Sequence, residues 1–567
     1  MLTVRAGGAE AAGLKIPTTE GDTVTRSSAS EGWGIRTVPA GLAQHYRDEG
    51  WWTGDTLGSM VAAGLGRAPR SRFHVGSKTR PYTGTFADVD RAARSLAGTL
   101  LARDIGPGSV IVVQLPNWVE AAITFWAAAY VGAIVVPVVH FYGPKEVGYI
   151  LDDTRPAVVV TPDRFGRTDH LQQYERLLGE RDGETLWLVV SDRPERELPR
   201  AATPFHRMLD GDPLPEPLPV DPAAPVIVGF TSGTTLNPKG VIHSHQTIGW
   251  EARQCDHFYG KGGPPQIVGT PVGHFMGMIN AFLLPLLRAE PVHLIDVWDP
   301  AEVLRMMGER KLGIAGGPTY FLTSLLDHPD FTPEHLSLIP YMGLGGAMVP
   351  EAFTERATKE GIAVFRSYGS TEHPSITASL LAEPADKRLR TDGRALPGAE
   401  VRLDEDGQIL SRGADCCVGY TDPALTARAF DADGWYRTGD MGVFDADGYL
   451  TITDRVADVI IRGGENISAQ EIESLLLKME QVAEVSVVAE PDARLGEHAA
   501  AVIRPHEAAG PVGLDDVRAH LAAAGLARQK WPESVHLVAD FPRTATGKIQ
   551  KFRLRQQIRD GALEHAR

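Results

Sequence analysis

Residues 225–245 hold the densest group of side chains in the sequence that could bind phosphate. An apolar strand pattern, PVIVGF, leads into the loop TSGTTLNPKG, and a second strand pattern, VIHSH, follows. Hydroxyls and backbone N–H groups beside glycine can surround phosphate oxygens, and Lys239 can add a positive charge. The loop is not a Walker A motif, because G-x-x-x-x-G-K-[ST] is absent. An ordinary polar hairpin is the alternative, which this concentration of hydroxyls and glycines beside a lysine disfavours.

Three positions further along the chain suit nucleotide chemistry. Glu372 stands beside two hydroxyl residues in YGSTE, and its oxygens suit Mg²⁺, a hard cation. Asp440 ends the run DGWYRTGD, where a carboxylate could accept hydrogen bonds from two ribose hydroxyls. Lys548 follows Gly547, whose backbone freedom would let the long side chain reach a distant site. Taken singly, these residues are more often a loop carboxylate, a turn residue and a surface lysine.

These segments, in this order, resemble the motifs of the adenylate-forming superfamily, which includes acyl-CoA synthetases, luciferases and nonribosomal adenylation domains. The match runs from about residue 45 to residue 560. The six motifs are TSGTTLNPKG (231–240), LGGAMVP (344–350), YGSTE (368–372), DGWYRTGD (433–440), DRVADVIIRGGENISAQEIE (454–473) and FPRTATGKIQK (541–551). The resemblance implies an α/β fold with a large N-terminal domain of α/β subdomains and a small, mobile α+β C-terminal domain.

The resemblance also assigns roles to single residues. It implies that Lys548 polarises the carboxylate and the α-phosphate, and that Thr371 meets the α-phosphate. It implies that Glu372 and Thr234 hold Mg²⁺ and that Asp440 binds the ribose. The implied contacts to ATP or AMP are Thr231, Ser232, Gly233, Thr234, Thr235, Lys239, Gly346, Ala347, Tyr368, Gly369, Ser370, Thr371, Asp440, Arg455 and Lys548.

The segment RGGEN resembles the loop that opens a passage for coenzyme A, the second co-substrate after ATP. Two adjacent glycines would let the thin pantetheine arm pass close to the backbone. The implied CoA contacts are Arg462, Gly463, Gly464 and Glu465.

A hinge is expected at residues 455–458. Lys548 and the glycine loop are both needed at one site, yet the resemblance assigns them to different steps. The small domain should therefore rotate between the two half-reactions. Family members often carry Asp or Lys two residues after the hinge arginine, whereas here Arg455 is followed by Val456, Ala457 and Asp458. Both Ala457 and Asp458 are candidates for the pivot.

The segment GHFMGMINAF bears on the acyl substrate. The resemblance implies that His274, Met278 and Gly345 line the acyl pocket, with a core histidine as the alternative at position 274. Domains that select α-amino acids carry an acidic residue here, but residues 273–282 contain none. A buried ammonium without a partner would be costly, so an apolar acid is expected. Other side chains expected to make the pocket apolar are Met276, Ile279, Phe282 and Phe321.

Together, these features predict an AMP-forming carboxylate–CoA ligase. The carboxylate attacks ATP to give acyl-AMP and pyrophosphate, and the CoA thiol then displaces AMP. The whole sequence, including the early GWWTGDTL, resembles bacterial fatty-acyl and cyclohexanecarboxylate CoA ligases. Two alternatives stay open: an acyl-AMP ligase that loads a carrier protein, and a non-catalytic acyl-nucleotide sensor. The chain length of the acid and the oligomeric state stay open as well.

The elements that must position these residues alternate along the chain. Short apolar runs separated by helical patterns are typical of parallel α/β sheets. These runs are residues 109–115, 133–139, 157–162, 186–191 and 225–230. A proline-rich stretch at 212–225 is interpreted as a linker between subdomains.

The expected domain boundaries follow from composition and periodicity. Residues 1–35 are Gly-, Ala-, Ser- and Thr-rich and form a flexible tail, 36–454 form the AMP-binding domain, and 459–567 form the small lid domain. Within the lid domain, Ser468 and Glu471 predict a capping box that begins a helix.

Composition excludes several classes of protein. The chain has 567 residues, which is too long for one compact core, and a net charge of −16, which disfavours nucleic acid as a partner. Three cysteines cannot form a disulfide framework, so a cytoplasmic location is expected. Residues 121–139 lack formal charge, but Gly132 and Pro137 interrupt them. A helix, a turn and a strand are expected there, rather than a membrane span.

Histidines and cysteines outside the motifs give weak signals. His243 and His245 alternate on the second strand pattern and lack a carboxylate partner for a metal site. Cys416 and Cys417 lack further ligands nearby and are interpreted as small buried residues.

Overall fold

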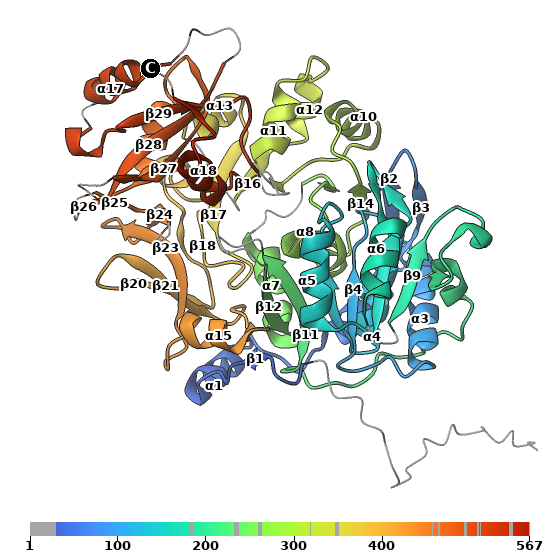
Figure 1. Cartoon of the computed structure of the whole chain (residues 1–567). Coiled ribbons are helices and arrows are strands. Elements are labelled where there is room, and N and C mark those ends of the chain that lie inside the picture. The colour runs from blue at the N-terminus through green and yellow to red at the C-terminus, as the bar shows by residue number, and fades with distance from the viewer. Residues whose placement is uncertain are drawn as a thin grey trace, which may run out of the picture.

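The computed structural model describes most of the chain. The described residues are 30–181, 185–231, 238–258, 263–317, 319–345, 351–455, 458–462, 465–492, 496–506, 510, 512–524, 526–543 and 548–565. They form a large N-terminal domain and, at the upper left of Figure 1, a small C-terminal domain. This arrangement confirms the predicted α/β fold class.

The central sheet of the large domain has nine strands within the described ranges. Their order is β1 (Gly34–Ile35), β22 (Gly419–Tyr420), β12 (Lys239–Ser244), β11 (Pro225–Thr231), β5 (Ile134–Pro137), β4 (Val110–Val113), β6 (Val158–Pro162), β9 (Leu186–Val190) and β10 (Ala202–Pro204). Neighbouring strands from β11 to β10 run parallel to each other, whereas the pairs β11–β12, β12–β22 and β22–β1 are antiparallel. All five apolar runs predicted as strands lie in this sheet.

Helices cover both faces of the central sheet. Because successive strand side chains point to opposite faces, Ile111 of β4 packs with α3 (Phe86–Leu101) and α4 (Val119–Tyr130), whereas Val110 and Val112 pack with α5 (Pro144–Thr154) and α6 (His170–Gly179). Figure 1 shows α5 and α6 in front of this sheet.

Residues 121–139 form the predicted helix, turn and strand. Every residue of α4 is buried, Gly132 turns the chain with a φ of 67°, and β5 follows. Among the described helices, none is long and apolar enough to cross a membrane.

The interpretation of residues 212–225 as a subdomain linker is wrong. β10 lies before this stretch and β11 after it, and both belong to the central sheet. The stretch instead packs on the large domain: the N–H groups of Leu214 and Leu218 donate to the carbonyls of Arg94 in α3 and Tyr130 in α4, and both leucine side chains contact the core. Prolines suit this extended path because they need no N–H partner.

Three smaller sheets and a hairpin complete the large domain. The first sheet has the strand order β13 (Ile267–Val268), β14 (Val292–Ile295), β2 (Arg72–Gly76) and β3 (Tyr82–Thr85), and the second has the order β15 (Gly316–Gly317), β16 (Tyr341–Leu344), β17 (Ala363–Tyr368), β18 (Thr377–Ala378) and β19 (Arg394–Ala395). The third sheet has the order β20 (Ala399–Leu403), β21 (Gln408–Gly413), β23 (Tyr436–Phe444) and β24 (Leu450–Arg455). The hairpin pairs β7 (Arg164–Phe165) with β8 (Thr168–Asp169). The remaining helices are α1 (Ala40–Asp48), α2 (Leu57–Arg67), α7 (His245–Phe258), α8 (Phe275–Phe282), α9 (Leu284–Arg288), α10 (Pro300–Arg310), α11 (Thr319–Leu326), α12 (Pro333–Ser337), α13 (Glu351–Lys359), α14 (Ala385–Arg390) and α15 (Pro423–Ala429).

The small domain is one mixed sheet with three helices among its described residues. The elements are β25 (Ile460–Arg462), β26 (Glu465–Ile467), β27 (Val482–Asp492), β28 (Gly496–Pro505), β29 (Ser534–Leu537), β30 (Glu564–His565), α16 (Ala469–Leu476), α17 (Leu514–Ala523) and α18 (Lys551–Arg559). Half of the predicted capping box is present: Ser468 Oγ accepts from the N–H of Glu471, whereas the Glu471 carboxylate pairs with Lys530.

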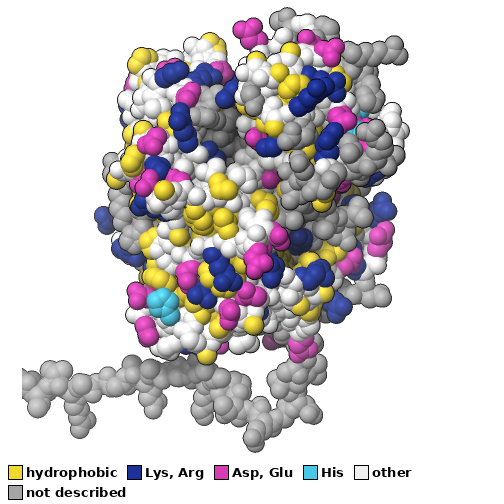
Figure 2. Space-filling view, turned by 90° about the vertical axis from the view of Figure 1, so that its left-hand side faces the viewer, with side chains coloured by type: hydrophobic (Ala, Val, Ile, Leu, Met, Phe, Trp, Pro, Cys, Tyr) yellow, Lys and Arg dark blue, Asp and Glu magenta, His cyan; other side chains and the backbone are white. Residues whose placement is uncertain are grey.

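The N-terminal boundary lies earlier than predicted. Gly34 and Ile35 form β1 on β22, so the structured chain includes the end of the segment expected to be a flexible tail. Figure 2 shows a notch between two lobes at the top of the molecule. On this face, the Lys and Arg side chains that are drawn in colour are interspersed with Asp and Glu.

Candidate active site

The two ends of the predicted phosphate loop are held together. Thr231 ends β11 and Lys239 begins β12, and the two residues are directly paired across these antiparallel strands. The residues between them that the resemblance assigned to ATP, Ser232, Gly233, Thr234 and Thr235, lie outside the described residues, as do Gly346 and Ala347.

The YGSTE loop leaves the end of β17 in a tight turn. The N–H of Ser370 donates to the carbonyl of His373 at 2.9 Å, and a Cβ at Gly369 would lie 1.9 Å from the Pro374 carbonyl oxygen. Only glycine fits at 369 because the backbone passes so closely. The buried Glu372 carboxylate accepts a hydrogen bond from the Tyr420 hydroxyl at 3.0 Å.

Asp440 lies between two predicted nucleotide contacts. The Tyr368 hydroxyl donates to Asp440 Oδ2 at 2.7 Å, and Arg455 Nε lies 3.0 Å from Oδ1. Burial raises the pKa of Asp440, and the charge of Arg455 opposes this shift. β23 and β24 produce this contact, because Asp440 and Arg455 are opposite each other in their register.

Lys548 of the small domain acts electrostatically on the same site. Its side chain stays open to solvent, yet the protein around it lowers its pKa, and the charge of Arg455 lowers it further. Asp440 and Glu372 act in the opposite direction. Lys548 is thus within electrostatic reach of the residues predicted to bind ribose and metal.

His274 occupies the N-cap position of α8 without a capping hydrogen bond from its side chain, and it stays neutral at physiological pH. Burial lowers its pKa to about 4, and the positive charge of Lys548 contributes. Its buried Nδ1 has no hydrogen-bond partner among the described residues.

A small apolar void of about 10 Å³, roughly the space that one water molecule needs, lies beside α8. Its lining comprises Val113, Leu115, Ala121, Phe125, Val135, Pro137, Val272, Gly273, Met278 and Phe282. Met278 and Phe282 thus face apolar surroundings. Phe321, which was expected beside them, lies elsewhere: its ring stacks on Trp298, 3.8 Å between centroids, in a separate hydrophobic cluster. Gly345 lies against β17, where a Cβ would meet Ser367 Oγ at 2.7 Å.

The predicted CoA residues belong to the small domain, where Arg462 Nε pairs with Glu533 at 2.7 Å. Glu465 lies in β26, and Gly463 and Gly464 are outside the described residues. At the expected hinge, Asp458 Oδ1 accepts from Arg555 of α18 at 3.0 Å, and Ala457 is likewise outside the described residues.

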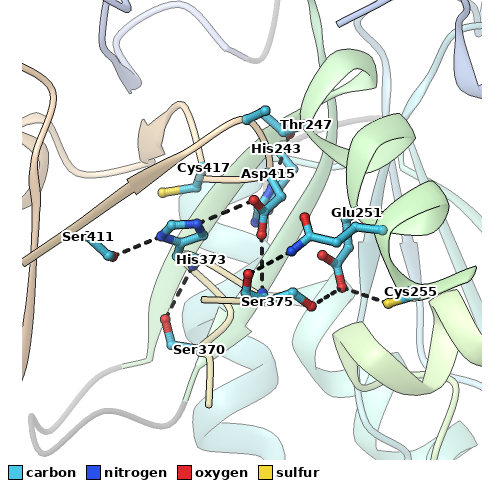
Figure 3. Close-up of polar contacts among 12 residues, drawn as sticks. His243, Thr247, Glu251, Cys255, Ser370, His373, Ser375, Ser411, Asp415 and Cys417 are labelled. Carbon is cyan, nitrogen blue, oxygen red and sulfur yellow. Dashed lines mark hydrogen bonds and ion pairs between the residues drawn. The ribbon is translucent and has the colours of Figure 1, made fainter. Parts of the chain in front are cut away.

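A buried polar cluster beneath the YGSTE loop was missed from the sequence (Figure 3). His373, directly after Glu372, lies 3.3 Å from Asp415 and 2.8 Å from Ser411 Oγ, and both His373 and Asp415 are fully buried. Asp415 Oδ2 also accepts from the N–H of Ser375, and the Ser375 hydroxyl donates to Glu251. The only sequence signal was that His373 adjoins a motif.

The two other weak signals have clear outcomes. Cys416 and Cys417 are buried, as expected. His243 lies on β12, but His245 begins α7, so the two do not alternate on one strand. In the described residues, no group of three His, Cys, Asp or Glu could hold a metal ion.

A large α/β domain and a small C-terminal domain bring Lys548 within electrostatic reach of Asp440 and Glu372, which is the arrangement expected of an adenylate-forming enzyme. The AMP-binding enzyme family model matches residues 65–420, and the model of its C-terminal domain matches residues 471–548. The chain therefore belongs to the AMP-binding enzyme family.

Curated relatives and solved structures extend this similarity over both domains. The medium-chain fatty-acid–CoA ligase of Escherichia coli (strain K12) is 30% identical over 544 residues, which cover 90% of this chain and 92% of the relative. A CoA ligase of Rhodococcus jostii (strain RHA1), whose acyl group is a propanoyl chain on a methyl-dioxo-octahydroindene ring, is 34% identical over 497 residues and 83% and 93% of the two chains. The fatty acyl CoA synthetase structure of Mycobacterium tuberculosis has a TM-score of 0.67 at 27% identity and covers 89% and 99% of the two chains. The protein is accordingly an enzyme of the AMP-forming acid–thiol ligase class, with ATP and CoA as co-substrates.

Proposed function

We propose that this enzyme activates an apolar carboxylic acid, whether fatty, cyclic or aryl, and transfers its acyl group to CoA. The observation that carries this proposal is the convergence of charged residues from both domains, with the charge of Lys548 also acting on His274 at the start of the apolar helix α8. Glu372, Asp440 and Arg455 come from the large domain and Lys548 from the small one. His274 is the N-cap of the helix that lines the small apolar void.

Lys548 neutralises negative charge during adenylation. The carboxylate of the acid attacks the α-phosphate of ATP, and pyrophosphate leaves with the bridging electron pair. A cation held by protein near the α-phosphate stabilises the charge that develops there. Asp440, held by Tyr368 and Arg455, accepts hydrogen bonds from the ribose hydroxyls. The CoA thiol then attacks the acyl carbonyl, and AMP leaves.

Mg²⁺ fits the donor set at Glu372. The carboxylate is buried, and after it accepts the hydrogen bond from Tyr420 it still has lone pairs that could bind a cation. Glu372 directly follows Ser370 and Thr371, which are predicted to contact the nucleotide. Mg²⁺ is commonly held by one or two carboxylates together with substrate phosphates and waters, so the lack of a multi-ligand cluster in the described residues agrees with this ion. When bound, Mg²⁺ offsets negative charge on the phosphates.

The apolar surroundings of α8 support an apolar acyl group. The side chains that line the small void there are hydrocarbon, aromatic or thioether. The void itself has room for only about one water, so an acyl group would require side chains such as the adaptable Met278 to move. Relatives that act on fatty and polycyclic acids agree with this assignment. A cytoplasmic location is proposed from the three free cysteines.

A panel of carboxylates tests the proposal. The enzyme is incubated with ATP, Mg²⁺ and octanoate, cyclohexanecarboxylate or benzoate, and AMP and pyrophosphate are measured with and without CoA. CoA-dependent, multiple-turnover AMP release is expected with at least one acid. Turnover that requires a carrier protein with a free pantetheine thiol in place of CoA would favour the carrier-loading alternative, and no pyrophosphate with any acid would favour the sensor.

A further inference from the structure

His243 connects the YGSTE loop to the strand that follows the predicted phosphate loop. It lies on β12, is fully buried, and its Nε2 is 2.7 Å from the carbonyl oxygen of Thr371. A carbonyl oxygen only accepts hydrogen bonds, so the Nε2 must carry the proton and donate. The other ring nitrogen, Nδ1, lies 3.1 Å from Thr247 Oγ1 at the start of α7. Figure 3 shows His243 and Thr247 next to each other in this cluster.

The same ring touches the acyl side of the site. The imidazole of His243 lies 4.7 Å, centroid to centroid, from the ring of Phe275, the first residue of α8. His274, the N-cap of α8, precedes Phe275 in the chain, and Gly273 before it lines the small apolar void. Gly229 of β11 packs directly against both Thr371 and Phe275, because a Cβ there would lie 2.9 Å from Thr371 Cγ2 and 3.4 Å from the Phe275 ring. Thr371, His243 and Phe275 thus meet in one packed contact.

The geometry suits a fixed, neutral ring. Burial lowers the pKa of His243 to about 4, so the imidazole is uncharged at physiological pH. The far end of the loop has its own anchors: the N–H of Ser375 donates to Asp415 at 3.1 Å, and His373 lies 2.8 Å from Ser411. Those contacts fix the loop after Glu372, whereas His243 fixes it at Thr371.

We propose that His243 is a positioning residue that sets Thr371, and through it the α-phosphate, relative to α8 and the acyl carboxylate. This inference rests on the proposed function, because it needs Thr371 to meet the α-phosphate. Adenylation requires the carboxylate oxygen and the phosphorus to approach in line at a short distance. A residue that contacts the loop on one side and α8 on the other couples the two substrates without touching either.

The test compares His243→Leu and His243→Gln with a matched variant. Leucine removes the donor, whereas the glutamine Nε2 can donate from nearly the same place. His245→Leu is the control, since His245 is equally buried, with a pKa also lowered to about 4, but its Nδ1 accepts from Leu57 of α2. We expect His243→Leu to lower kcat for pyrophosphate release by on the order of 10- to 100-fold, with a smaller change in KM for ATP. His243→Gln should recover most of the loss, and His245→Leu should lower Tm without this loss of kcat.

Amide hydrogen exchange provides a readout that does not depend on activity. In the ligand-free enzyme, exchange across residues 368–376 should rise in His243→Leu, return in His243→Gln and stay unchanged in His245→Leu. If His243→Leu does not fold, His243→Asn replaces it, because the shorter amide cannot reach the Thr371 carbonyl. Equal losses of kcat in the leucine variants at 243 and 245, or unchanged exchange, would overturn the inference. A wild-type enzyme inactive on every acid would overturn the proposed function. The exchange data would still show whether His243 holds the loop at Thr371.

Discussion

At the scale of single residues, the site combines charges that the protein holds partly out of water. Burial raises the pKa of Asp440, and the protein around the solvent-exposed Lys548 lowers the pKa of its amine, so the fold disfavours the charged form of each. Their mutual attraction and Arg455 offset part of this cost for Asp440. Such opposed shifts in one place are typical of functional sites.

Lys548→Ala tests the role of the lysine. Pyrophosphate release should fall by about 100-fold or more, because the cation supplied by the small domain no longer stabilises the charge that develops at the α-phosphate. Reaction of supplied acyl-AMP with CoA should stay within a few-fold of wild type. The matched control is Arg553→Ala, an exposed basic residue of α18 that should leave both rates near wild type. Near-normal pyrophosphate release by Lys548→Ala would show that Lys548 does not act in adenylation.

Glu251 gives a prediction about stability and pH. Burial, with a contribution from the Asp415 charge, raises the pKa of this fully buried carboxyl above its ordinary 4.5. A carboxyl with a raised folded-state pKa stabilises the fold fully below its unfolded pKa, and this contribution is lost as pH rises through the folded value. Glu251→Gln mimics the protonated form and keeps an oxygen for the Ser375 hydroxyl.

The Tm of Glu251→Gln should therefore exceed that of wild type by more at pH 8.5 than at pH 5, on the order of 1–2 °C. The exposed Glu175 of α6 provides the control, since Glu175→Gln should show no such dependence. A Tm difference that stays constant between the two pH values contradicts a proton held by Glu251 in the folded protein.

At the scale of elements, α8 is the helix that the proposed function places against the acyl group. It follows the N-cap residue His274, contacts His243 through Phe275, and faces the small apolar void with Met278 and Phe282. No acidic side chain lies among residues 273–282, and burial holds His274 neutral. The helix therefore offers no negative charge to a substrate ammonium.

Free α-amino acids should be rejected for this reason. 4-Methylpentanoate and leucine differ only by an ammonium, which would lie buried without a carboxylate. We expect kcat/KM for leucine to be lower by at least about 100-fold. The comparison is AMP formation with both acids at equal concentration and pH 7.5, with CoA present. Comparable turnover of the two acids would show that an acidic group from elsewhere reaches the pocket.

At the scale of the whole molecule, the expected hinge lies between anchors on opposite domains. Arg455 pairs with Asp440 of the large domain, and Asp458 pairs with Arg555 of the small domain. Rotation would have to break the contacts of α16 with β24, in which Ser468 Oγ donates to the Thr453 carbonyl and Gln470 Nε2 to that of Ile452. Because Asp458 is tied to the small domain, the pivot is expected at Val456 and Ala457.

Ala457→Pro tests this pivot. Proline fixes φ near −65° and removes an N–H, so it should hold one arrangement of the domains. With Lys548 facing the nucleotide residues here, adenylation should be kept and acyl transfer to CoA should fall by about 10-fold or more. Pyrophosphate release and acyl-CoA formation are measured separately, with Ala457→Ser as the control. Equal changes in both rates would show that residue 457 is not the pivot and would favour Asp458 instead.

The sequence by itself determined the class of fold and the chemistry. Apolar runs of strand length between helices predicted the central sheet, because buried parallel strands need continuous apolar surface. Motif order assigned Lys548, Asp440 and Glu372 to one reaction. These features are local, since each depends on residues that are neighbours in the chain.

Only the tertiary structure decided which distant groups meet. The contacts of His243 with Thr371 and of His373 with Asp415 join segments far apart in sequence. Neither contact produces a periodic pattern in the sequence from which it could be predicted. Phe321 was misplaced for the same reason, because hydrophobicity predicts burial but not in which cluster a side chain is buried. The proline-rich stretch was misinterpreted because composition does not record that β10 and β11 share a sheet. Packing, which is non-local, decided each of these.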